Sequence, residues 1–398
     1  MLLDYRSIIM SLFFSRIAVL GVTGVAILSL AAGCSIPNPF QNLTTQKTPV
    51  AVGILKHDPA VKAEGFGKVN RMVAGNGEEV SDGLTNSQIA KLIQVNGDKW
   101  IAFSWNSGLF QTENGGRLWK RQYLFSTKDK TGDEYNKAVS DSNGFSYSDV
   151  AFTNNNQDVY IGGQSGDKFG KIYKSIDAGS SFKEVFSDVN SSSRVRRIVV
   201  DANRPATVYA VQDNQMLYSR DSGNTWSRWV NLQGKVIQMG VFSDKRTYAF
   251  TDSSRLYIFT DRSGVAPEFS EISLKVKGGG LFGSGAERIE QSQKDAGDFL
   301  VISNNALWVS RGGYDKEFEQ LALPTVGSSV NILTATLDPK LGADRMIVSV
   351  NNKLFESNNR GKSWKTASNL GLESEVGSIG VIAIDRDKTD VIYLGLVR

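Results

Sequence analysis

Short runs of apolar and β-branched residues, separated by polar turns, recur along the chain from about residue 50 onward. Three of these runs end on an Asp and suit the innermost strand of a repeat unit, at 195–201, 332–338 and 379–385. A second apolar run follows each of them, at 208–211, 345–350 and 391–396. Short strands at regular spacing predict an all-β repeat architecture.

Four turns share the pattern S/T-x-D/N-x-G-x-x-W/F. The Asp or Asn can accept hydrogen bonds from the backbone of its own turn, and the Gly can adopt a positive φ. The aromatic residue begins the next strand and packs on its neighbours. These residues are Asn114, Gly116 and Trp119; Asp177, Gly179 and Phe182; Asp221, Gly223 and Trp226; and Asn359, Gly361 and Trp364.

This pattern resembles the Asp-box (BNR) repeat of the sialidase-like β-propellers. The resemblance implies a structural hairpin between the third and fourth strands of each blade and no catalytic role for the box. The chain is closest in kind to non-catalytic members, such as photosystem II assembly and stability factors and sortilin-type receptors.

The spacing of the turns predicts the number of blades. Two degenerate copies, at 260–264 and 310–318, bring the spacing of the turns near the roughly 40–50 residues of one blade. A polar insertion at 126–144 accounts for the one long interval. The last unit ends after two strands, and the runs at 50–57 and 66–72 can complete it. We therefore expect one seven-bladed propeller over residues 50–398, with six blades and a separate hairpin as the alternative.

The N-terminal segment predicts export and lipid attachment. Residues 17–33 carry no charge, follow two arginines and end at Ala-Ala-Gly before Cys34. This resembles the bacterial lipobox, which implies a signal peptide at 1–33, lipidation of Cys34 and a flexible tether at 34–49. The expected location is the bacterial cell envelope, outside the cytoplasm. Either Met1 or Met10 can start the chain, and inner and outer membrane both remain open.

Composition excludes several kinds of chemistry. One Cys and one His cannot build a Cys-rich or His-paired metal site. A formal net charge of +4 without a basic tract gives no nucleic-acid footprint. We expect a monomer without metal or cofactor, bound to the membrane through its lipid and to another envelope protein or an anionic or glycan ligand.

Basic residues on the predicted inner strands are the first candidate contacts. Arg194, Arg196 and Arg197 begin one such strand, and Arg288 and Lys91 lie on others. Together they can form a basic channel mouth for an anionic peptide, sugar or lipid headgroup. The alternative is a solvated rim on which nearby acids balance the charge, namely Asp149, Glu287 and Glu290.

A glycine-rich segment at 277–286 holds the second pair of candidates. Its five glycines surround Leu281 and Phe282, which can face a partner on a mobile loop. The alternative is that the pair packs back onto a blade.

Two functions remain after these exclusions. The favoured one is a membrane-tethered, non-catalytic binding or assembly scaffold outside the cytoplasm. The alternative is a sialidase-type exo-glycoside hydrolase, although the chain lacks the Arg-Ile-Pro motif of that family. Three arginines converging beside a Tyr–carboxylate contact would favour the enzyme.

Overall fold

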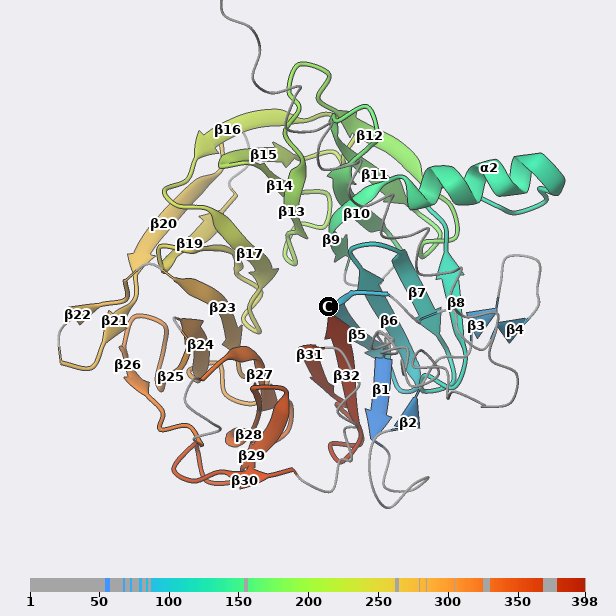
Figure 1. The fold of residues 1–398 in the computed structure, drawn as a ribbon. Coiled ribbons are helices and arrows are strands. Elements are labelled where there is room, and N and C mark those ends of the chain that lie inside the picture. Colours follow the sequence, from blue (N-terminus) through green and yellow to red (C-terminus); the bar gives the residue numbers. More distant parts are fainter. Residues whose placement is uncertain are drawn as a thin grey trace, which may run out of the picture. The chain divides into compact units, whose positions relative to one another are not determined.

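Seven β-sheets, each built on a four-stranded antiparallel blade, surround a central axis in the computed structural model of this chain (Figure 1). The structure describes residues 54–57, 67–68, 72–73, 79–80, 84, 87–153, 157–261, 265–278, 280–283, 285–303, 305–324, 330–367 and 378–397. The predicted seven-bladed propeller is confirmed, and the six-bladed alternative is wrong. The expected signal peptide, Cys34 and the tether lie outside the described residues. Within those residues, no helix is long and apolar enough to cross a membrane.

Each blade has one inner strand beside the axis and three strands further out. From inner to outer, blade 1 contains β5 (Ile89–Asn96), β6 (Lys99–Ser104), β7 (Gly108–Thr112) and β8 (Trp119–Gln122). Blade 2 contains β9 (Ser146–Phe152), β10 (Val159–Gln164), β11 (Gly170–Ser175) and β12 (Lys183–Ser187). Blade 3 contains β13 (Val195–Val200), β14 (Val208–Gln212), β15 (Gln215–Ser219) and β16 (Ser227–Asn231).

The remaining blades follow the same order around the ring. Blade 4 contains β17 (Val236–Val241), β18 (Thr247–Thr251), β19 (Arg255–Thr260) and β20 (Glu268–Ser273). Blade 5 contains β23 (Ala286–Gln291), β24 (Phe299–Ser303), β25 (Ala306–Ser310) and β26 (Glu317–Gln320). Blade 6 contains β27 (Ile332–Asp338), β28 (Gly342–Val350), β29 (Lys353–Ser357) and β30 (Lys365–Thr366). Blade 7 contains β31 (Ser378–Ile384), β32 (Ile392–Val397), β1 (Ile54–His57) and β2 (Gly67–Lys68).

Blade 7 is built from both halves of the chain, as the sequence predicts. β1 pairs antiparallel with β32, from Ile54 opposite Gly395 to His57 opposite Ile392. β2 adds to the outside of β1. This pairing closes the ring and covers the edge of β32 that would otherwise be exposed.

The run at 66–72, however, does not form one strand. Its last residue belongs to β3 (Met72–Val73), which pairs with β4 (Glu79–Val80) and lies parallel to β8 of blade 1. The chain therefore crosses from blade 7 to blade 1 within this run. A second such hairpin, of β21 (Lys275–Val276) and β22 (Gly280–Leu281), lies parallel to β26 of blade 5.

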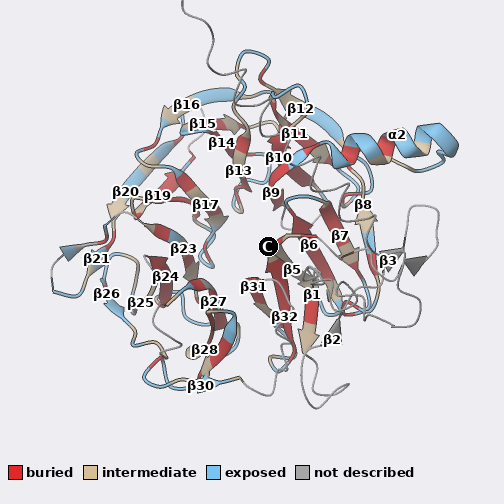
Figure 2. Ribbon diagram, in the orientation of Figure 1, coloured by how far each residue is buried: buried red, intermediate tan, exposed pale blue. Residues whose placement is uncertain are grey.

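The core lies between the blades. Buried hydrophobic side chains of the described residues form seven clusters, one at each interface between neighbouring blades. Figure 2 shows these buried residues along the strands of every blade. Trp119 of the first Asp-box is fully buried in the cluster between blades 7 and 1. The box aromatics thus hold adjacent blades together.

All four Asp-box turns connect the third and fourth strands of their blades and share one hydrogen-bond pattern. In the third turn, the Ser219 hydroxyl donates to Asp221 Oδ1 and accepts the N–H of Gly223, both at 2.8 Å. Asp221 Oδ1 also accepts the N–H of Thr225 at 2.8 Å. Gly223 has a φ of +88°, and the residue before it, Ser222, has a φ of +59°. The turn therefore takes two left-handed residues, where the sequence pattern indicates one.

The degenerate turn of blade 4 uses its acid differently. Asp261 is 9 % exposed and accepts a hydrogen bond from Arg220 Nε at 3.0 Å and from Thr207 Oγ1 at 2.9 Å. Both donors belong to blade 3, so Asp261 joins two blades instead of bracing its own turn.

A β-bulge interrupts each inner strand near its start. The bulged residues are Ala90, Ser148, Arg196, Ile237, Glu287, Leu333 and Gly380. In five consecutive blades, the side chain of the residue after the bulge forms a hydrogen bond with the inner strand of the next blade. A β-bulge changes the direction of the side chains beside it, which explains these contacts. These five residues are Lys91, Asp149, Arg197, Gln238 and Arg288.

The inner strands all begin on the same side of the ring, which distinguishes two faces. The Asp-box turns lie where the inner strands end, and we name this side the Asp-box face. The predicted polar insertion lies where β9 begins and forms helix α2 (Gly132–Asn143), so we name this side the insertion face. In Figure 1, α2 extends outward from the ring.

Candidate functional site

Three adjoining cavities lie along the axis of the ring. The insertion-face cavity has a volume of about 520 Å³, the middle cavity about 490 Å³ and the Asp-box-face cavity about 440 Å³. The first two share Trp105, Ser148 and Arg197, and the last two share Arg288 and residues of β5, β17 and β31. Their charges differ, and that difference identifies the candidate site.

The insertion-face cavity is basic and partly aromatic. Its cations come from the starts of two neighbouring inner strands, and its described lining contains no Asp or Glu. The cations are Arg194, Arg196, Arg197 and Lys235, and the aromatic residues are Trp105, Phe145 and Tyr147. The structure thus brings together the three arginines that the sequence indicates.

Little in the structure neutralises these cations. Arg196 forms an ion pair with Asp213 at the protein surface, with 3.5 Å between the charged atoms. Such an exposed ion pair contributes little free energy in water. Arg197 donates to two backbone carbonyls, those of Ile237 at 2.6 Å and Arg196 at 2.8 Å. Within the described residues, no carboxylate lies within ion-pair distance of Arg194, Arg197 or Lys235. The cavity therefore offers uncompensated positive charge to an anion.

The insertion forms one wall of this cavity. Asn143, at the end of α2, accepts a hydrogen bond from Arg121 of β8 at 2.7 Å. The Tyr147 hydroxyl donates to the carbonyl of Ser142 at 2.9 Å. Burial raises the pKa of Tyr147, against the opposing effect of Arg121, so the phenol stays a neutral donor. These contacts fix the end of α2 beside the basic residues.

The middle cavity is neutralised internally. Lys91 forms an ion pair with the buried Asp149 and donates to the carbonyl of Val150 at 3.1 Å. Arg288 donates to Thr334 at 2.9 Å and lies 3.5 Å from Glu290. Arg288 lines the middle and Asp-box-face cavities and does not line the insertion-face cavity. For this cavity, the alternative that nearby acids balance the basic residues describes the structure better than a basic channel mouth.

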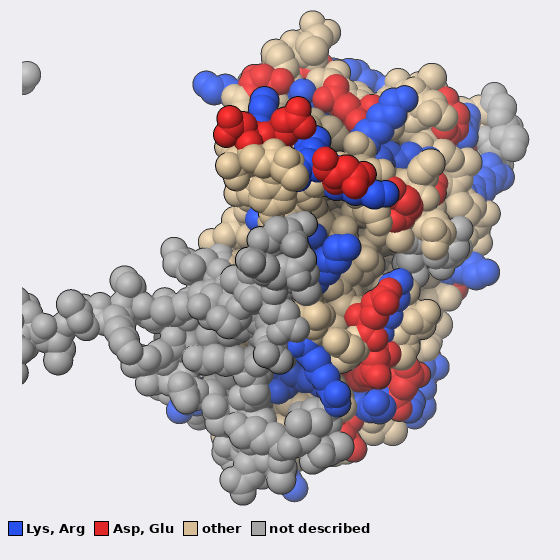
Figure 3. All heavy atoms as spheres, turned by 90° about the vertical axis from the view of Figure 1, so that its right-hand side faces the viewer, with Lys and Arg blue, Asp and Glu red and all other residues tan. Residues whose placement is uncertain are grey.

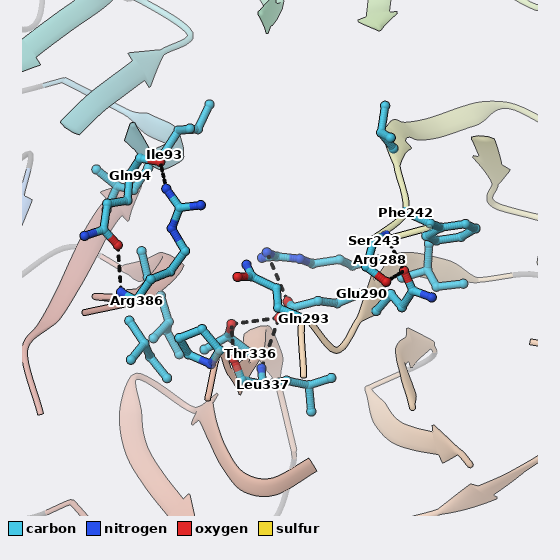
Figure 4. Close-up of a pocket in the computed structure, with 18 of the residues that line it drawn as sticks. Ile93, Gln94, Phe242, Ser243, Arg288, Glu290, Gln293, Thr336, Leu337 and Arg386 are labelled. Atoms are coloured by element: carbon cyan, nitrogen blue, oxygen red, sulfur yellow. Dashed lines mark hydrogen bonds and ion pairs between the residues drawn. The ribbon is translucent and has the colours of Figure 1, made fainter. Parts of the chain in front are cut away.

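In the Asp-box-face cavity, polar lining residues likewise form hydrogen bonds between blades (Figure 4). Glu290 accepts hydrogen bonds from Thr336 Oγ1 at 2.8 Å and from the N–H of Leu337 at 3.0 Å. The Arg386 side chain donates to the carbonyls of Gln94 and Val95. These groups hold the ring together, so we do not assign a ligand to this cavity.

Phe282 has a structural position. It is 8 % exposed and packs edge-on against Trp308 and Phe318, with ring centroids 5.0 and 5.3 Å apart. The ring of Phe282 therefore packs back onto the blades, in the core between blades 4 and 5, as the alternative expects. Leu281 pairs through its backbone with Lys275 in the β21–β22 hairpin.

Several cavity residues escaped the sequence analysis. Trp105 is 44 % exposed in the turn between β6 and β7, and Lys235 precedes β17. The sequence shows that both residues lie near strand ends, but it does not show that they meet on the same side of the ring.

The outer surface of the propeller carries mixed charges. On the side shown in Figure 3, basic and acidic residues lie next to one another.

Comparisons with known proteins support the fold. The sequence matches no known protein family and no curated protein. Among solved structures, YCF48 bound to a D1 peptide matches with a TM-score of 0.53 and 14 % identity, covering 78 % of this chain and 93 % of that one. YCF48 from Cyanidioschyzon merolae gives 0.54 and 11 %, covering 78 % and 96 %. The GH74 enzyme of Niastella koreensis gives 0.52 and 16 %, covering 78 % and 51 %. At these identities the likeness shows the fold, and function rests on the site.

Proposed function

We propose that this protein is a membrane-tethered scaffold outside the cytoplasm that binds an acidic protein segment in its insertion-face cavity. The observation that carries the proposal is the described lining of that cavity, with four cations and no carboxylate. Arginine forks suit carboxylates, and the exposed ring of Trp105 adds apolar surface for the rest of a peptide. That YCF48, a protein of similar fold, has been solved with a bound peptide supports this choice.

The location follows from Cys34, which we propose as the lipidated first residue of the mature protein in the bacterial cell envelope. A tether of about 16 residues then joins it to the propeller. Inner and outer membrane are both compatible with this arrangement.

A glycoside hydrolase is less well supported. Such enzymes need two carboxylates, or a Tyr with a carboxylate, at the reacting bond. In the insertion-face cavity, Tyr147 is buried and bonded to Ser142, and the described lining has no acid. Release of product from a fluorogenic sialoside, lost on Tyr147→Phe, would revive the enzyme.

Peptide binding tests the scaffold proposal. A labelled ten-residue peptide rich in Glu should bind, and the Arg194→Ala/Lys235→Ala double variant should weaken its binding at least tenfold, as charge-assisted hydrogen bonds are worth about 1.5–3 kcal/mol each. The matched control is Arg117→Ala/Lys362→Ala, which removes the same charge from exposed Asp-box turns. Equal weakening in both variants, or no binding at all, would refute the proposal.

A further inference from the structure

The direction of β1 fixes where the N-terminal segment joins the ring. β32 runs from the Asp-box face to the insertion face, because it follows the inner strand β31 in antiparallel pairing. β1 is antiparallel to β32, so its first residue, Ile54, pairs with Gly395 near the insertion face. Its last residue, His57, pairs with Ile392 near the Asp-box face. The chain therefore enters the propeller at the edge of the insertion face.

The basic cavity opens on this same face. Arg194, Arg196 and Arg197 lie at the start of β13, and Lys235 lies just before β17. Gly395, the partner of Ile54, lies against Ile89 at the start of β5, which confirms that both features share one end of the inner strands. Trp105, 44 % exposed, lies at this end as well. Trp side chains favour the boundary between water and membrane.

We propose that the insertion face is turned toward the membrane and that its cavity receives an acidic segment of an integral membrane protein. This inference rests on the proposed function and on Cys34 as the anchor. About 20 residues separate Cys34 from Ile54, a chain that spans at most about 70 Å when fully extended. The tether therefore keeps the cavity within reach of protein segments close to the bilayer surface.

A protein segment fits the cavity better than a layer of lipid headgroups. The cations line a concave space of about 520 Å³, and the aromatic surface that it exposes comes from Trp105. A flat anionic surface is met by an exposed, convex basic patch, whereas a single chain can enter a recess and use its aromatic wall.

Orientation can be measured directly, because Cys34 is the one cysteine of the chain. The chain from residue 35 onward contains every described strand, and residues 49–398 form one compact unit. An N-terminal hexahistidine tag in place of Cys34 attaches it to vesicles with nickel-chelating lipids. Single Ser→Cys variants then carry a fluorophore, and lipid-attached quenchers report its proximity to the bilayer.

Ser192 and Ser180 form a matched pair for this measurement. Both are exposed, and they lie near opposite ends of β12, with Ser192 on the insertion face and Ser180 in an Asp-box turn. Labels at Ser192→Cys should be quenched at least twice as strongly as labels at Ser180→Cys. Equal or reversed quenching would overturn the orientation, while peptide binding in solution would still stand as a separate result.

A second experiment separates protein from lipid as the occupant. The untagged chain is mixed with vesicles of phosphatidylglycerol, and sedimentation is compared with that of the Arg194→Ala/Lys235→Ala variant. We expect no cavity-dependent sedimentation. Binding that the double variant abolishes would assign the cavity to anionic lipid and would overturn the proposed partner.

Discussion

The side-chain amide of Gln238 bonds both backbone groups of Ile289 on the neighbouring blade. Its Nε2 donates to the Ile289 carbonyl at 2.9 Å, and its Oε1 accepts the Ile289 N–H at 3.0 Å. Gln238 follows the bulge of β17, so one irregularity in blade 4 positions a side chain that completes the backbone of blade 5. The bulged ends of the inner strands thus act as joints between blades.

Replacing Gln238 should loosen this joint in steps. Gln238→Glu keeps an acceptor but loses the donor, whereas Gln238→Leu loses both and leaves two inner-strand groups of Ile289 without partners. Unsatisfied buried groups cost about 1–3 kcal/mol each, so we expect about 2–6 kcal/mol for Leu and less for Glu. Urea unfolding followed by tryptophan fluorescence measures both. Equal, negligible losses would show that water replaces the side chain.

Trp119 and Trp105 should differ sharply in their contribution to stability. Trp119 is fully buried between blades 7 and 1, whereas Trp105 is 44 % exposed at the cavity. Trp119→Ala should cost about 3–5 kcal/mol of unfolding free energy. Trp105→Ala should change stability by about 0.5 kcal/mol or less but weaken peptide binding. The reverse ranking would contradict the assignment of one ring to the core and the other to the site.

The Asp-box acids should make stability depend on pH. Burial raises the pKa of Asp221, but hydrogen bonds from Thr225 and Ser219 outweigh it and hold the pKa below its ordinary value. The same balance holds the pKa of Asp177 low. A carboxyl whose pKa is depressed by folding stabilises the fold above its unfolded pKa of about 4 and loses that contribution as pH falls through its folded pKa.

The double variant Asp177→Asn/Asp221→Asn tests this source of acid sensitivity. Two natural boxes already carry Asn, at Asn114 and Asn359, and Asn359 Oδ1 accepts the N–H of Ser363 at 2.9 Å in the same geometry. The variant should fold and show a shallower loss of stability as the pH falls below about 4. Asp221→Ala should instead cost about 1–2 kcal/mol at neutral pH. If the dependence of unfolding free energy on pH stayed unchanged in this variant, groups other than Asp177 and Asp221 would have to cause the loss of stability in acid.

Ring closure should require the N-terminal strands. Removal of residues 50–73 deletes β1, β2 and β3 and exposes the edges of β32 and β8. Exposed strand edges pair with other chains, so we expect aggregation instead of a smaller monomer. Size-exclusion chromatography distinguishes the two. A soluble monomer with intact peptide binding would mean that six blades suffice.

Cys34 should determine membrane attachment without affecting the fold. Cys34→Ser should move the protein into the soluble fraction while its unfolding midpoint and peptide binding stay unchanged, because the residue precedes every described strand. Sedimentation of the variant with membranes after a salt wash would point to another means of attachment.

Short sequence patterns predicted the fold because each blade is formed by residues that are close together in the sequence. The aligned Asp201, Asp338 and Asp385 each end an inner strand, and each carboxylate accepts the backbone N–H groups two and three residues further on. Turn spacing gave the blade count, since one blade is nearly one sequence repeat. The hairpins beside blades 1 and 5 were missed, because two-residue strands carry no periodic pattern.

The site was predicted only in part, because it depends on which side of the ring a residue faces. Arg194, Arg196 and Arg197 are neighbours in sequence and stayed together. Arg288 was grouped with them because it also lies on a predicted inner strand, yet its side chain donates a hydrogen bond to Thr334 on the next inner strand. Lys235 and Trp105 join the cavity from other blades, which no pattern within one repeat could indicate.

The shared blade 7 also sets the order in which the ring can close. β1 and β2 lie early in the chain and can pair with each other at once, but the inner neighbour of β1 is β32, which follows all six other blades. Blade 7 can therefore form only after the strands of the other blades have been made. A chain cut short before β32 would lack the strand that joins β1 to β31, and its ring could not close.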